Sequence, residues 1–128
     1  VINDKKSLGP YFFSQSELKS ALDQKTVLVL DVRSPADFNI GRIPESINVY
    51  WNETLEANRN PKPAEELISI FNEKGVTPDK HIVLFTRGGV QLTYMYTLLK
   101  LLGYPKVSAY VGRWNGWESP SWQAVLEK

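Results

Sequence analysis

The sequence lacks cysteine: none of its 128 residues is one. Disulfide bonds, thiolate metal ligands and cysteine nucleophiles are therefore excluded within this chain. Long apolar runs are also missing, since none approaches the roughly 20 residues that span a bilayer, and the first residues form neither a signal-peptide core nor an amphipathic transit segment. We expect a chain without metal or cofactor that does not enter a membrane, and we favour a cytoplasmic location.

An excess of one charge is missing too. Fifteen lysines and arginines oppose 14 aspartates and glutamates, which leaves a formal net charge of +1. Nucleic acid is therefore not an expected partner. The length and the 42% of hydrophobic residues suit a single domain at residues 1–128, with a core at about 12–118, a polar N-terminal extension and a C-terminal tail. Because the first residue is valine, we interpret the chain as processed or as part of a longer protein.

The sequence alternates between helix and strand patterns. Ser14 and Glu17 have the spacing of a capping box, which predicts that a helix begins here and runs to about Asp23. A further helical stripe is formed by Ala64, Leu67, Ile68 and Phe71. The predicted helices cover residues 14–23, 34–40, 64–74 and 92–102, and the predicted strands cover 26–32, 46–50, 81–85 and 107–110. Short apolar strands between helices are typical of an α/β domain with a mainly parallel sheet.

The strongest functional signal follows the strand at residues 81–85. The segment Thr86-Arg87-Gly88-Gly89-Val90-Gln91 turns sharply from this strand into an apolar helix. The first amides of that helix have no partner within it, so together with Arg87 they favour a bound anion. We therefore predict that residues 86–91 bind a small oxyanion. The alternative is that the two glycines only permit the tight turn.

Other candidate site residues have structural alternatives. Thr86 is a weak candidate nucleophile, because a hydroxyl needs an adjacent base and the only histidine, His81, lies about four or five residues away along the same strand, at about 3.3 Å per residue. Asp31 and Arg33 are predicted to form an ion pair or a cap that supports the site loop, and catalysis is the alternative. Trp51, Trp122 and the tyrosines near the loop are interpreted as packing, with the wall of a pocket as the alternative.

Several motifs resemble the rhodanese (sulfurtransferase) homology domain. The first block of that family reads approximately DVRSPxEFxxGHIPGAxN, which residues 31–49 match in order. Residues 82–91 look like its active-site strand and loop, of the form CRxGVR or CRxGVT, and residues 102–107 and 112–117 resemble its closing LGYxxV and GGWxxW blocks. The matches cover nearly all of residues 15–118.

The resemblance implies a three-layer α/β domain with a mainly parallel five-stranded sheet and helices on both faces. In this family, a cysteine at the position of Thr86 accepts sulfur from thiosulfate or mercaptopyruvate as a persulfide and passes it to cyanide or another thiophile. Thr86 cannot carry a persulfide. Gln91, Arg42 and Val111 also depart from the residues usual in the family, whereas residues 87–90 keep its loop.

Two functions follow from the resemblance. The first is a non-catalytic rhodanese-like domain whose loop binds thiosulfate or sulfate, or which docks against a second rhodanese domain or another protein. The second is an active thiosulfate sulfurtransferase, which requires that position 86 was originally cysteine or that another domain supplies the thiol. Serine and alanine are the commoner laboratory replacements, which favours threonine as the natural residue. The segment at residues 117–122 and the loop after Tyr50 resemble the second half of tandem sulfurtransferases.

Overall fold

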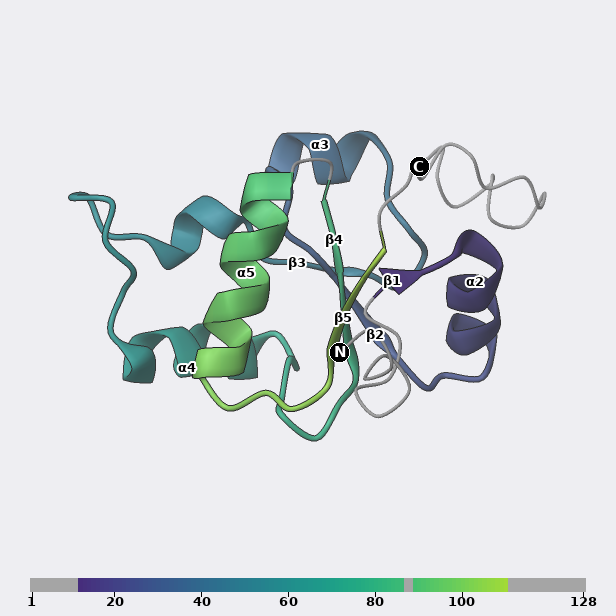
Figure 1. Ribbon diagram of the computed structural model, residues 1–128. Helices are drawn as coiled ribbons and strands as arrows, with labels where there is room; N and C mark the ends of the chain where they lie inside the picture. The colour runs from purple at the N-terminus through teal and green to yellow at the C-terminus, as the bar shows by residue number, and fades with distance from the viewer. Residues whose placement is uncertain (1–11, 87–88, 111–128) are drawn as a thin grey trace.

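A parallel sheet lies between helices in the computed structural model, which describes residues 12–86 and 89–110 (Figure 1). The strands are β1 (Phe12–Phe13), β2 (Leu28–Asp31), β3 (Ile47–Asn48), β4 (Ile82–Phe85) and β5 (Val107–Tyr110). The helices are α2 (Gln15–Asp23), α3 (Pro35–Ile40), the 3₁₀ turn η1 (Trp51–Thr54), α4 (Ala64–Glu73) and α5 (Gly89–Leu101). No described helix is long and apolar enough to cross a membrane.

The sheet has the order β1-β5-β4-β2-β3, and all its neighbouring strands are parallel. This confirms the predicted five-stranded parallel sheet. The register pairs Leu30 with Leu84 and Asp31 with Phe85, so β2 and β4 end side by side. The residues that follow these two strands therefore emerge at the same edge of the sheet.

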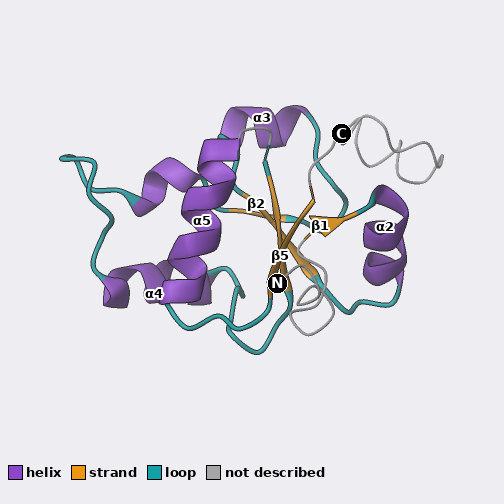
Figure 2. Cartoon of the chain, viewed as in Figure 1, coloured by secondary structure: helices purple, strands orange, loops and turns teal. Residues whose placement is uncertain are grey.

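Alternate residues of the central strands face opposite helical layers. Ile82 and Leu84 belong to a buried cluster that also contains Leu67 and Phe71 of α4, whereas Val83 packs in a second cluster with residues of α2. Figure 2 shows α4 and α5 on one side of the strands and α2 on the other. The expected helices on both faces are confirmed, and the near-continuous apolar strands are explained by burial on both sides.

Local signals place most helix ends correctly. Ser14 Oγ accepts a hydrogen bond from the Glu17 amide at 3.1 Å, while the Ser14 amide donates to Glu17 Oε1 at 2.8 Å, which completes the predicted capping box. Ser34 Oγ accepts from the Asp37 amide at 3.1 Å and caps α3 in the same way. Gly75 follows α4 with a φ of +82°, a conformation that glycine adopts without strain.

Three features depart from the sequence prediction. Helix α5 begins at Gly89, three residues before its predicted start at residue 92, because the second glycine is accommodated in the first helical turn. Strand β1 was not predicted, because its two residues carry no alternating pattern and form a strand only by pairing with Ala109 and Tyr110 far along the chain. Two members of the predicted α4 stripe, Ala64 and Ile68, are exposed, the latter at 37%, and the buried residues of this helix are Leu67 and Phe71. Residues 112–117, the last of the motif blocks, and Trp122 lie outside the described residues, and the single-domain prediction for residues 1–128 stays a prediction.

Candidate functional site

A pocket opens at the edge of the sheet where β2 and β4 end. It has a volume of about 460 Å³ and is lined by Arg33, Ser34, Asp37, Tyr50, Trp51, Thr86 and Gln91. The first two residues follow β2, and Asp37 belongs to α3. Tyr50 and Trp51 lie at the beginning of η1, Thr86 follows β4, and Gln91 belongs to α5. The carboxyl edge of a parallel sheet is the usual ligand-binding position in such folds. We call this cavity the Thr86 pocket.

Thr86 directly follows β4 and is 7% exposed. Gln91 lies in the first turn of α5, is half-buried, and lines the same pocket, so the structure brings both ends of the predicted loop to one cavity. Between them, Gly89 and Val90 are exposed, the latter at 82%, and Arg87 and Gly88 lie outside the described residues. Anion binding by residues 86–91 therefore stays a prediction.

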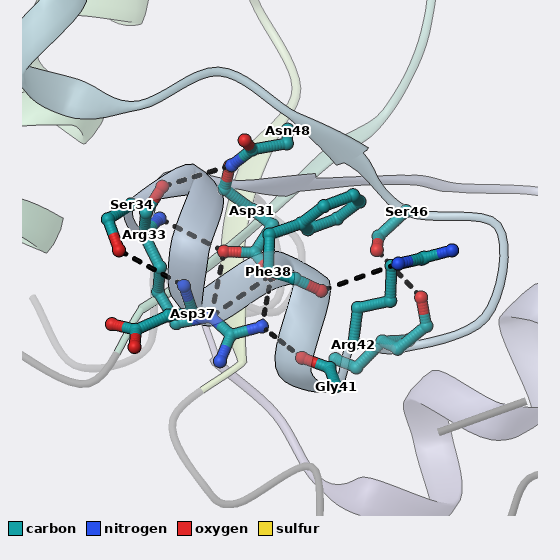
Figure 3. A network of polar contacts seen from close by, with 10 residues as sticks. Asp31, Arg33, Ser34, Asp37, Phe38, Gly41, Arg42, Ser46 and Asn48 are labelled. Carbon is teal, nitrogen blue, oxygen red and sulfur yellow. Dashed lines mark hydrogen bonds and ion pairs between the residues drawn. The ribbon is translucent and has the colours of Figure 1, made fainter. Parts of the chain in front are cut away.

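Asp31 and Arg33 form a buried ion pair beside the pocket, as one of the two sequence interpretations predicted. Arg33 Nη2 donates to Asp31 Oδ2 at 2.7 Å, and Arg33 Nε lies 3.0 and 3.1 Å from the two carboxylate oxygens (Figure 3). The side chain of Asp31 is fully buried, and Arg33 is only 5% exposed. This planar, two-pronged contact fixes the guanidinium more firmly than a single hydrogen bond would.

Asp31 and Arg33 also contact three further segments through their side chains or their backbone carbonyls. Arg33 Nη2 also donates to the carbonyl oxygen of Gly41 at 2.7 Å, which fixes the end of α3 (Figure 3). Asn48 Nδ2 donates to the carbonyl oxygens of Asp31 and Arg33 at 2.9 and 3.0 Å, and so fixes β3 to the end of β2. The Arg33 guanidinium carbon also lies 4.9 Å from the centre of the Phe85 ring, and Phe85 is the residue that precedes Thr86 in the sequence. Arg33 Nη1 has no hydrogen-bond partner among the described residues, although Arg33 lines the pocket.

His81 lies at the opposite end of β4 from Thr86. Four strand residues separate them, roughly 15 Å along the chain. His81 Nε2 makes a 2.8 Å hydrogen bond with Ser108 Oγ, and burial, with a smaller contribution from the Lys106 charge, lowers the pKa of the histidine. This position removes His81 as a base for the Thr86 hydroxyl, as the sequence spacing indicated.

The pocket contains residues that the sequence interpretation did not assign to a site. Ser34 and Asp37 were interpreted only as the beginning of a helix, and Tyr50 only as part of a short strand. Both interpretations of Trp51 are confirmed, since it lines the pocket and also packs against the core cluster that contains Leu30 and Leu84. In residues 12–86 and 89–110 no cluster of three or more potential metal-ligating side chains was found.

Comparison with known proteins gives a consistent result. The Rhodanese-like domain family matches residues 14–120. A thiosulfate sulfurtransferase of Pseudomonas aeruginosa is 27% identical over 108 residues, which cover 78% of this chain and 40% of that protein. A 3-mercaptopyruvate sulfurtransferase of Escherichia coli is 32% identical over 108 residues, which cover 76% of this chain and 38% of that protein. The chain therefore spans about 40% of the length of these relatives.

The fold agrees with the sequence comparison. The crystal structure of a 3-mercaptopyruvate sulfotransferase from Escherichia coli superposes with a TM-score of 0.71 at 32% sequence identity, covering 80% of this chain and 40% of that one. The family match, the parallel sheet order and the position of the pocket at its carboxyl edge point to the same conclusion. The chain belongs to the rhodanese-like domain family.

Proposed function

We propose that this chain is a rhodanese-like domain that binds a small oxyanion in the Thr86 pocket but does not transfer sulfur. The observation that carries the proposal is the absence of cysteine from the chain, with a threonine at the end of β4 on the pocket wall. Sulfur transfer by a persulfide requires a thiolate that attacks the outer sulfur of thiosulfate, releases sulfite and later gives that sulfur to cyanide. A threonine hydroxyl stays protonated at neutral pH and cannot form the sulfur–sulfur bond.

The proposed oxyanion ligands are sulfate and thiosulfate. Support comes from the residues that line the pocket and can donate, which carry the Thr86 hydroxyl, the Gln91 amide group and Arg33 Nη1. Arg87 lies outside the described residues and is a further donor that the sequence alone predicts. Binding to the folded chain raises its melting temperature by mass action. We expect sulfate to raise the melting temperature of the native chain and to raise that of Arg87→Ala less. Equal stabilisation of the two proteins would count against Arg87 as a ligand.

The loss of sulfur transfer is tested by the thiosulfate and cyanide assay, which measures thiocyanate. We expect no turnover above a buffer blank for the native chain. Thr86→Cys should gain activity because its thiol would lie in the pocket, whereas Thr97→Cys, which places a thiol on the exposed face of α5, should not. Turnover by the native chain would refute the proposal. Equal activity of the two cysteine variants would show that the pocket adds nothing to a surface thiol.

A second candidate function is sulfur transfer in which another domain supplies the thiol. It is favoured by one observation, that the related sulfurtransferases are more than twice as long as this chain. In this case, the docking partner would be a second rhodanese domain that presents its cysteine near Val90, an exposed residue that directly precedes Gln91 of the pocket. Thiocyanate formation on mixing the native chain with such a domain, above that of the domain alone, would support this function.

A further inference from the structure

Asp37 is the only carboxylate among the described residues that line the Thr86 pocket. It lies in the first turn of α3, where its amide donates to Ser34 Oγ at 3.1 Å and fixes this turn at the pocket wall. The side chain is exposed, and within the part of the chain that the structure describes its carboxylate has neither an ion pair nor a hydrogen bond. The carboxylate is therefore available to a ligand.

The charge of Asp37 is not balanced by Arg33, which is the other charged residue in the part of the pocket wall that the structure describes. Arg33 is paired with Asp31 at 2.7 Å, and Asp31 has no exposed surface, so the positive charge of the guanidinium is already offset. Figure 3 shows the contacts of Arg33 with Asp31 and Gly41 but none with the Asp37 carboxylate. Within the described part of the pocket wall, the Asp31–Arg33 pair and Asp37 together leave no net positive charge to offset a dianion.

Hydrogen-bond donors also line this pocket. Thr86 and Gln91 carry a hydroxyl and an amide group, and Arg33 retains Nη1, all of which suit the oxygens of an anionic group. Asp37 suits the opposite kind of group, a cation or a strong donor. A volume of about 460 Å³ accommodates both groups of a small molecule together. The pocket thus offers one partner for each charge of a zwitterion.

We infer that Asp37 is a specificity-determining residue, which makes the Thr86 pocket select a small zwitterion, an anionic oxygen group joined to an ammonium group, over a free dianion. This inference rests on the proposed oxyanion site. Taurine and isethionate are the appropriate probes, because both carry a sulfonate on a two-carbon chain. Taurine has an ammonium group at the other end of this chain, whereas isethionate has a hydroxyl group there. Sulfate serves as the third probe and represents a free dianion.

The test is calorimetric titration of the native chain, Asp37→Asn and Asp23→Asn with each probe at constant ionic strength. Asp23 is exposed at the end of α2 and does not line the pocket, so its variant has the same charge change elsewhere. We expect the native chain and Asp23→Asn to bind taurine about two- to fivefold more tightly than isethionate. Asp37→Asn should bind both equally and should bind sulfate about two- to fivefold more tightly than the native chain does.

Other results would overturn the inference in distinguishable ways. A preference for taurine that persists in Asp37→Asn, or equal binding of taurine and isethionate by the native chain, refutes the role of Asp37. If sulfate binding depends on Arg87 while Asp37→Asn changes nothing, the oxyanion site stands and only the inference fails. If neither the native chain nor Asp37→Asn binds any probe, both fail. Because affinities for two probes are compared within one variant, a small loss of α3 stability does not affect the ratio.

Discussion

The buried ion pair gives the most quantitative prediction, through the variant Arg33→Met. Methionine keeps an unbranched side chain but removes all donors of the guanidinium. Asp31 would lose its contacts with Nε and Nη2, at 2.7 to 3.1 Å, and would keep only the hydrogen bond from the Arg33 amide to Oδ1 at 3.0 Å. A fully buried carboxylate would then remain without its cation.

The expected loss of stability follows from this geometry. Removing one partner of a buried ion pair costs about 3 to 5 kcal/mol, because the remaining charge is uncompensated. The Gly41 carbonyl also loses its 2.7 Å donor, which adds about 1 kcal/mol. With an unfolding entropy of about 2.1 cal/mol/K per residue, 128 residues give a decrease of about 4 °C per kcal/mol, and thus about 15 to 25 °C in all.

Urea unfolding followed by tryptophan fluorescence measures this loss, with Arg42→Met as the matched control. Arg42 is partly exposed, lies 4.8 Å from the centre of the Phe38 ring, and makes a 3.4 Å hydrogen bond to the Phe38 carbonyl. Its removal should cost less than about 1 kcal/mol, since no buried charge is left behind. An Arg33→Met variant as stable as Arg42→Met would refute the assigned role of the pair.

Two further stability predictions concern His81 and Tyr104. Burial and the Lys106 charge lower the pKa of His81 below its ordinary value of about 6.5, so the histidine binds a proton more readily in the unfolded chain than in the native chain. The native chain should therefore lose stability as the pH falls from about 7.5 to 5. His81→Gln should show a smaller decrease in the urea midpoint over this range; an unchanged decrease would exclude the histidine as its cause. Tyr104→Phe should cost about 1 to 2 kcal/mol in urea unfolding, because it removes the buried 2.7 Å hydrogen bond to the Val76 carbonyl, and unchanged stability would contradict this.

Features that depend on neighbouring residues could be predicted from the sequence. The capping box at Ser14 and Glu17 and the glycine that ends α4 are determined within four or five residues, and the structure has both. The Asp31–Arg33 pair is also local, since its members are two residues apart in an extended segment. Strand β1 could not be predicted in this way, because Phe12 and Phe13 become a strand only through residues 109–110.

The composition of the pocket depends on the three-dimensional arrangement. Asp37 has the pattern of any acidic residue in a first helical turn, and nothing local indicates that α3 begins beside the end of β4. That position results from the parallel register of β2 and β4, which pairs Asp31 with Phe85. Trp51 packs against the core and also lines the pocket, a combination that its residue type alone does not predict. The sequence therefore indicated the segment on one side of the pocket. The residues on the opposite side could be identified only from the three-dimensional structure.

The scaffold of the Thr86 pocket and the chemistry proposed for it depend on different atoms. Arg33 holds Asp31 and Gly41, and Asn48 holds the end of β2, through hydrogen bonds that do not include Thr86. Strand β4 is positioned by its pairing with β2 and β5, before position 86 is reached. Cysteine and threonine are similar in size, so neither residue at this position disturbs these contacts. A rhodanese-like domain can therefore lose its sulfur carrier and keep its pocket, and activity in Thr86→Cys would report on the pocket rather than on refolding around a new side chain.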